Sequence, residues 1–169
     1  IIDVESNIKN PVRPVILNEF KNIIRFENVS FQYENSDQHS LVDINVEILK
    51  GSTLALVGSS GAGKSTFADL IPRFYDVSKG FISIDGVDIY EIEIEKLRSF
   101  MGIVSQDTIL FNDTVFNNIC YGNRETSIET IRLAAVAANA LEFIEKLPNG
   151  FDTIVGEKGT RLSGGQKQR

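Results

Sequence analysis

The stretch Gly58-Ser59-Ser60-Gly61-Ala62-Gly63-Lys64-Ser65 decides the fold of this chain, because it matches G-x-x-x-x-G-K-[ST] at every fixed position. An apolar run, 53–57, precedes it, and a helical pattern over 64–71 follows it until Pro72. A run without a polar face predicts a strand buried on both sides, as in parallel sheets. The order of strand, glycine loop and helix predicts a site for a nucleoside triphosphate. A Gly/Ser turn that happens to precede a helix is the alternative.

The chemistry of the loop follows from its residue types. Glycines let the backbone curve into a nest whose N–H groups face phosphate oxygens. We expect Lys64 to reach the β- and γ-phosphates and the Ser65 hydroxyl to bind Mg²⁺, which prefers hard oxygen ligands. The motif alone does not choose between an ATPase, a GTPase and a kinase. The expected phosphate-binding residues are Gly58, Ser59, Ser60, Gly61, Ala62, Gly63, Lys64, Ser65 and Thr66.

Alternating hydrophobicity predicts strands on the N-terminal side of the loop. Alternation begins at Ile24 and slips in phase near Asn28, which predicts a bulged strand. It returns over 44–48, and the turn residues 34–40 in between predict an antiparallel pair. Residues 1–22 are polar, contain two prolines and predict a linker.

Beyond the loop, Asp85-Gly86 stands between the apolar runs 81–84 and 87–89. Both turn residues tolerate positive φ, so this segment predicts a tight hairpin. The pattern over 94–100 predicts a helix, and 101–105 predicts another core strand.

The second half of the sequence predicts helices. Thr126 and Glu129 have the spacing of a capping box. Apolar residues then recur on one helical face, which predicts a single helix to about Leu147, where Pro148-Asn149-Gly150 stops it.

The composition is that of a globular domain, with 169 residues, 42% of them hydrophobic and 24% charged. A net charge of −6 argues against a nucleic-acid-binding surface. Cys120 is the only cysteine, so an internal disulfide is excluded, and we expect it to be a small buried residue. The single histidine, His39, falls in a predicted turn. No stretch approaches the ~18 apolar residues that a membrane span needs, so we expect no direct insertion of this segment into a bilayer.

A second glycine motif, Leu162-Ser163-Gly164-Gly165-Gln166, lies near the end of the sequence. Ser163 can cap a helix, and the glycines let a phosphate approach the backbone. With the phosphate loop upstream, this pentapeptide makes the chain resemble the nucleotide-binding cassette of ATP-binding cassette (ABC) transporters. The resemblance implies an α/β P-loop NTPase fold with an N-terminal antiparallel β subdomain, a partial RecA-like core and a helical subdomain that carries the signature motif.

The resemblance also implies roles for single residues. Tyr33 stands where cassettes place an aromatic ring that stacks on adenine, although a core aromatic at a strand end is the alternative. Gln106 corresponds to the glutamine that contacts Mg²⁺ and the attacking water. In the family two cassettes pack head to tail, so the signature of each acts on the ATP of the other. The residues implied to act in this way are Ser163, Gly164, Gly165 and Gln166.

Longer stretches resemble exporter cassettes, above all those of lipid A and multidrug exporters. They are 71–76, 110–115 and 149–153. The stretch 156–159 resembles the X-loop, which contacts intracellular helices of the membrane domain, and Ile154 stands where exporters commonly carry an acidic residue. The resemblance therefore implies a motor domain at the cytoplasmic face of the inner membrane. It would couple the binding and hydrolysis of ATP, with Mg²⁺, to export of a lipid or other amphipathic substrate through a transmembrane domain.

By this resemblance, residues 1–22 join a preceding transmembrane domain to a partial cassette, 23–169. The Walker B strand, its catalytic Glu, the D-loop and the switch histidine of complete cassettes are not in the sequence. Hydrolysis needs a positioned nucleophile, so we expect this chain alone to bind ATP without hydrolysing it, although Lys64 and Gln106 belong to the catalytic set. Two alternatives remain open: a soluble ABC ATPase of DNA repair or translation, and a non-catalytic nucleotide-binding remnant. The uninterrupted spacing from Gln106 to Leu162 argues against repair proteins, which insert long coiled coils there.

Overall fold

The computed structural model describes residues 8–105, 108–123 and 125–169, without the side chain of Lys158. Gln106 lies outside the described residues. The chain divides into two compact units, Ile1–Gly102 and Ile103–Arg169, and each is described by itself. Across the described residues, no helix combines the length and the apolar character needed to cross a bilayer.

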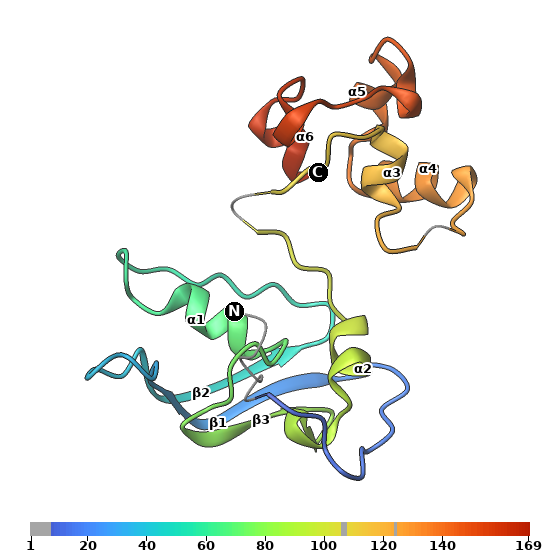
Figure 1. Ribbon diagram of the computed structural model, residues 1–169. Coiled ribbons are helices and arrows are strands. Elements are labelled where there is room, and N and C mark those ends of the chain that lie inside the picture. The colour runs from blue at the N-terminus through green and yellow to red at the C-terminus, as the bar shows by residue number, and fades with distance from the viewer. Residues whose placement is uncertain (1–7, 106–107, 124) are drawn as a thin grey trace. The chain divides into compact units, whose positions relative to one another are not determined.

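The first unit is built on an antiparallel sheet with the strand order β2-β1-β3-β4 (Figure 1). The central strand β1 pairs with β2 on one side and β3 on the other, which confirms the predicted antiparallel pair. The strands are β1 (Ile23–Phe31), β2 (Leu41–Leu49), β3 (Lys79–Ile84) and β4 (Val87–Asp88).

The predicted bulge and hairpin are both present. Asn28 has φ 50°, and the register of β1 shifts around it against both neighbours. Residues three apart in a regular strand face opposite ways, so the bulge is what allows both Phe26 and Val29 to be buried. In the hairpin, Asp85 and Gly86 have φ of 52° and 84°, and they join the paired ends of β3 and β4.

Two helices of this unit match their predictions to within a residue. Helix α1 (Lys64–Leu70) packs on the sheet through Phe67, whose ring stacks on Phe26 with centroids 4.3 Å apart. Leu97 of α2 (Ile94–Ser99) is buried in the same core, which also includes residues of the 3-10 turn η1 (Ile89–Glu91). This core fixes α1, and with it the end of the phosphate loop, on the sheet.

The two predicted core strands are wrong. Residues 53–57 and 101–105 have no strand structure, and Val57 and Val104 are 93% and 72% exposed. A strand buried on both faces needs hydrogen-bonded neighbours and a covering layer on each side. Among the described residues only β1 to β4 form a sheet, and none of them pairs with either run. Among the described residues, Met101 packs on the core of the first unit, but Val57, Ile103 and Val104 stay more than half exposed, so neither run has the cover that a core strand needs.

The second unit is helical, with a small core around Ile144 and Val155. The segment before α3 lies beside a later one, because Thr114 bridges Ile154 and the Val115 N–H bonds the Thr153 carbonyl at 3.0 Å. Its helical elements are α3 (Val115–Ile119), α4 (Ile128–Ala137), α5 (Leu141–Glu145), the 3-10 turns η2 (Gly150–Asp152) and η3 (Glu157–Gly159), and α6 (Gly164–Gln168).

The single helix predicted from Thr126 to Leu147 is also wrong, because Asn139 adopts φ 53° and separates α4 from α5. The N-cap is Ser127, whose hydroxyl accepts the Thr130 N–H, and no capping box forms between Thr126 and Glu129. The Thr126 hydroxyl instead donates to the Asn123 carbonyl at 2.8 Å. Two neighbouring hydroxyls compete for one cap here, and spacing alone does not decide between them.

The segment before β1 is held on the hairpin by one carboxylate. Asp85 accepts the backbone N–H groups of Lys21, Asn22 and Ile23 at 2.6, 2.8 and 2.9 Å. Desolvation acts to raise the pKa of Asp85, but these three bonds and the charge of Lys50 outweigh it and hold the pKa below its usual value. The ionised carboxylate thus joins the lead-in to the sheet.

Replacing Asp85 with Asn should lower the free energy of unfolding by about 1 kcal/mol at pH 7, because an amide nitrogen cannot accept a backbone N–H bond. Asn tolerates positive φ, so the turn itself is preserved. The folded-state pKa lies below the unfolded value of 3.8, so this stabilisation is present above 3.8 and is lost as pH falls through the folded-state pKa. Urea unfolding at several pH values measures the difference.

The matched control for this change is Asp37→Asn, in an exposed turn, which should leave stability unchanged. A stability loss for Asp85→Asn that is the same at neutral pH and well below pH 3.8 would contradict the role of the carboxylate charge.

Candidate nucleotide-binding site

The phosphate loop, residues 58–63, is open to solvent. Residues 58–62 are all exposed, and Gly61 and Gly63 have φ of 82° and 81°. One internal bond, from the Ala62 N–H to the Ser59 carbonyl at 3.2 Å, closes a turn in its middle. The loop is thus curved at the predicted glycines and accessible to a ligand.

Gly63 lies against the chain that enters β2. A Cβ atom at this position would lie 2.6 Å from the Ser40 carbonyl oxygen and 2.9 Å from Cδ2 of Leu41. Gly63 also precedes α1 directly as its left-handed N-cap. Both the backbone conformation and the close approach therefore require glycine here.

The Lys64 side chain folds back over the loop. Its ammonium group donates to the carbonyl oxygens of Gly58 at 2.9 Å and Ser59 at 2.7 Å. The positive charge is thus held at the loop by neutral acceptors. Phosphate oxygens would be stronger partners for it, because their negative charge adds a direct attraction to the ammonium group that a neutral carbonyl oxygen lacks.

Ser65 and Thr66, in the first turn of α1, have different surroundings. Ser65 is exposed, and its hydroxyl is a hard oxygen donor of the kind that Mg²⁺ accepts alongside waters and phosphates, so it fits the predicted metal ligand. Thr66 is only 6% exposed, and its hydroxyl forms a 3.0 Å hydrogen bond with that of Tyr33. The structure thereby brings two predicted site residues, Tyr33 and Thr66, into direct contact.

Tyr33 lies just beyond β1 and has two aromatic neighbours. Its ring forms T-shaped pairs with Phe31 and Tyr75, with centroids 4.8 and 5.2 Å away and interplanar angles of 86° and 87°. Tyr75 did not emerge from the sequence as a nucleotide-binding residue. It follows α1 in a segment with no local pattern that points back to Tyr33, so its place is visible only in the fold.

The signature motif is in the second unit. Ser163 caps α6 as predicted, and the cap is reciprocal: its hydroxyl accepts the Gln166 N–H at 3.3 Å, and its own N–H donates to the Gln166 side chain at 2.9 Å. Gly164 and Gly165 are exposed, and a Cβ at either would meet nothing within 4 Å. The backbone of this motif is therefore accessible.

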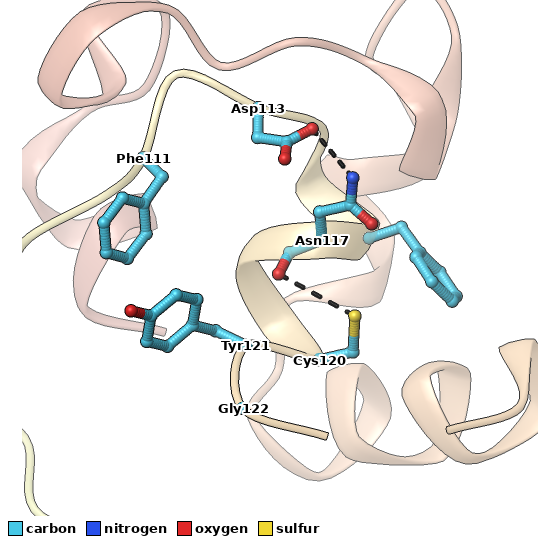
Figure 2. Close-up of a pocket in the computed structure, with 7 residues that line it drawn as sticks. Phe111, Asp113, Asn117, Cys120, Tyr121 and Gly122 are labelled. Atoms are coloured by element: carbon cyan, nitrogen blue, oxygen red, sulfur yellow. Dashed lines mark hydrogen bonds between the residues drawn. The ribbon is translucent and has the colours of Figure 1, made fainter. Parts of the chain in front are cut away.

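A cavity of about 700 Å³ in the second unit is distinct from these motifs (Figure 2). Asp113 accepts a bond from the Asn117 amide at 2.8 Å, and the Cys120 thiol, buried as predicted, lies 3.7 Å from the Asn117 carbonyl. The residues that line it are Phe111, Asp113, Phe116, Asn117, Cys120, Tyr121 and Gly122. None of these is a predicted nucleotide ligand.

A comparison with protein families decides what these motifs belong to. The family described as ABC transporter matches residues 41–169, which is most of the chain. The chain belongs to the ABC transporter family. The resemblance seen in its two glycine motifs and the P-loop NTPase fold class of the cassette are thereby confirmed.

The cassette is similar to known exporters. Over its whole length it is 49% identical to the ATP-dependent lipid A-core flippase of Desulfotalea psychrophila (strain LSv54 / DSM 12343), and the match covers 29% of that protein. Over 86% of its length it is 52% identical to the putative multidrug export ATP-binding/permease protein YgaD of Bacillus subtilis (strain 168), and the match covers 25% of that protein. A solved bacterial Atm1-family ABC exporter with ATP bound matches 98% of the chain with a TM-score of 0.88 and 44% identity. The chain spans less than a third of the length of these proteins.

Gly63→Ala should destabilise the first unit more than Gly61→Ala. Both changes put a side chain at positive φ, which costs roughly 1–2 kcal/mol. Only at position 63 does the new Cβ also clash with backbone, at Ser40, whereas a Cβ at position 61 meets nothing within 4 Å. Urea unfolding of the two variants measures the difference, and equal losses of stability would show that the contact with Ser40 does not constrain the loop.

Proposed function

We propose that this cassette is the ATP-binding motor part of an ABC exporter, and that it couples ATP binding and hydrolysis to export of a lipid or other amphipathic substrate. The observation that carries the proposal is the open phosphate loop with the Lys64 ammonium already held over it. The similarity of the whole chain to a lipid A-core flippase supports the exporter assignment and the lipid class of substrate.

The open loop and the position of Lys64 support the phosphate part of the proposed binding mode. Backbone N–H groups of residues 58–66 surround the phosphates, and Lys64 exchanges its two carbonyl partners for phosphate oxygens. The Tyr33 ring stacks on adenine, and Ser65 together with Gln106 holds Mg²⁺. When bound, the metal ion neutralises charge on the transferred phosphoryl group. The chain's own part is to bind and orient the triphosphate.

A second cassette is the proposed partner. In a head-to-tail pair, the exposed backbone at Gly164 and Gly165 faces the ATP held by the other cassette's loop, with Ser163 and Gln166 beside it. A transmembrane domain is the other partner, joined through residues 1–22 to the cassette over 23–169. With these partners, the cassette is proposed to lie at the cytoplasmic face of the inner membrane.

The catalytic base is proposed to come from outside this sequence. Cassettes use a Glu that follows an Asp after a short apolar strand, and the dipeptide Asp-Glu occurs nowhere in the 169 residues. The chain by itself should therefore bind Mg-ATP but show negligible turnover, since charge stabilisation without a positioned water gives little hydrolysis.

Lys64→Ala in the full-length protein should abolish ATP hydrolysis and weaken Mg-ATP binding at least tenfold, because a charged contact to the phosphates is lost. The matched control is Lys146→Ala, since that lysine forms only an exposed ion pair with Glu142 on α5. Hydrolysis rates and binding of a fluorescent ATP analogue test both variants. Wild-type hydrolysis that survives Lys64→Ala would refute the proposal.

The head-to-tail pairing predicts that the effect of two combined changes on nucleotide trapping depends on whether they lie in the same subunit or in different subunits. Gly165→Asp places a carboxylate where phosphate should approach, and the space around Gly165 admits a side chain. When Lys64→Ala and Gly165→Asp lie in different subunits, both changes damage the same site and the second site stays intact. About half of the Mg-ATP trapped by the wild-type dimer should then remain. When both lie in one subunit, each site is damaged and trapping should vanish.

Mixed dimers isolated with two affinity tags allow this comparison, with trapped Mg-ATP as the readout. The reversed pattern, with trapping lost when the two changes lie in different subunits and half retained when both lie in one subunit, would show that the signature acts within its own cassette and would rule out the head-to-tail partner.

A further inference from the structure

We propose that Tyr75 is a positioning residue for nucleotide binding, because its ring holds Tyr33 in the orientation that receives the base. The inference rests on the proposed function, in which Tyr33 stacks on adenine. It adds a residue that touches neither the base nor the phosphates and acts through the ring of Tyr33.

The contacts form a closed triangle of rings. Tyr33 forms T-shaped pairs with both Phe31 and Tyr75, and the centroids of those two rings are themselves 5.5 Å apart at an interplanar angle of 51°. Edge-to-face contact is the geometry that aromatic pairs prefer. Phe31 is buried in the sheet core and forms one wall beside the Tyr33 ring, and Tyr75 forms the second wall that limits its rotation.

The hydroxyl end of Tyr33 is fixed as well. It is hydrogen-bonded at 3.0 Å to Thr66, which is buried in α1 directly after Lys64 and Ser65. A side-chain hydrogen bond thus joins the Tyr33 ring, which would meet the base, to the helix turn that follows the phosphate loop. This bond limits movement of the hydroxyl end of the Tyr33 ring.

Tyr75 is presented by a rigid segment. Arg73, only 4% exposed, pairs with Asp76 at 2.8 Å and lies over the ring of Tyr90 at 4.4 Å. Arg98 donates to the carbonyls of Pro72 and Arg73, each at 3.0 Å. The bonds from Arg98 hold the backbone before Tyr75, and the Arg73–Asp76 pair joins the side chains on either side of it. Tyr75 itself is 41% exposed. The residue can therefore be shortened without opening the sheet core.

Removing the ring should weaken ATP binding without slowing chemistry. Without this wall the Tyr33 ring would sample orientations that cannot stack on the base. Binding would then have to fix the ring, and the conformational entropy lost in doing so would weaken affinity for ATP. The reacting phosphates are not touched by Tyr33 or Tyr75, so turnover at saturating ATP should be preserved. A positioning role therefore predicts a rise in KM with a steady kcat.

The experiment uses the full-length protein with Tyr75→Ala, Tyr75→Phe, Tyr33→Ala and the double variant Tyr33→Ala/Tyr75→Ala. We expect Tyr75→Ala to raise KM for ATP roughly three- to tenfold, the range that loss of an aromatic pair corresponds to, with kcat within about twofold. Tyr75→Phe keeps the ring and should match the wild type. In the Tyr33→Ala background, Tyr75→Ala should have no further effect.

Inorganic tripolyphosphate separates this role from a general loss of structure, because it offers the phosphates without a base. Its inhibition constant should be unchanged by Tyr75→Ala. A fall in kcat at constant KM, an additive effect in the Tyr33→Ala background, or weaker tripolyphosphate inhibition would each overturn the inference. If Tyr75→Ala does not fold, Tyr75→Leu, which keeps apolar bulk, is compared by the same criteria. A wild-type protein that neither binds nor hydrolyses ATP would instead refute the proposed function itself.

Discussion

The close approach of Gly63 to the chain at Ser40 and Leu41 is the constraint on which the site depends. It seats the end of the phosphate loop on the sheet at the point where α1 begins. From there Phe67 stacks on Phe26 of β1, and Thr66 bonds Tyr33 beyond the end of the same strand. One glycine contact therefore sets the direction of the loop, the position of the helix and the place of the aromatic ring relative to both.

The electrostatics of the loop are local. The chain carries a net charge of −6, which would repel a triphosphate if charge were spread evenly. The loop instead concentrates one ammonium group and a set of backbone N–H groups in an exposed turn, and the two carbonyls that hold Lys64 are neutral. Exchanging these carbonyls for phosphate oxygens is favourable without any wider basic patch.

Local chemistry could be predicted from the sequence, and long-range pairing could not. The bulge at Asn28, the Asp85-Gly86 hairpin, helix α1 and the Ser163 cap all depend on residues within a few positions of one another. The runs 53–57 and 101–105 failed as strands because a strand also needs neighbours, which a hydrophobic pattern does not supply. The break at Asn139 shows that a continuous apolar face does not guarantee one helix. Tyr75 was missed because its contact with Tyr33 exists only after β1 and the segment following α1 are brought together.

The most direct test of the account is a structure of the full-length protein with Mg²⁺ and a non-hydrolysable ATP analogue. The account predicts that Nζ of Lys64 leaves the carbonyl oxygens of Gly58 and Ser59 and bonds phosphate oxygens that are surrounded by the loop and the first turn of α1, residues 58–66. The Tyr33 ring should lie parallel to adenine. If, at saturating analogue, Lys64 remained on the two carbonyls and the nucleotide were bound elsewhere, the central claim would be contradicted.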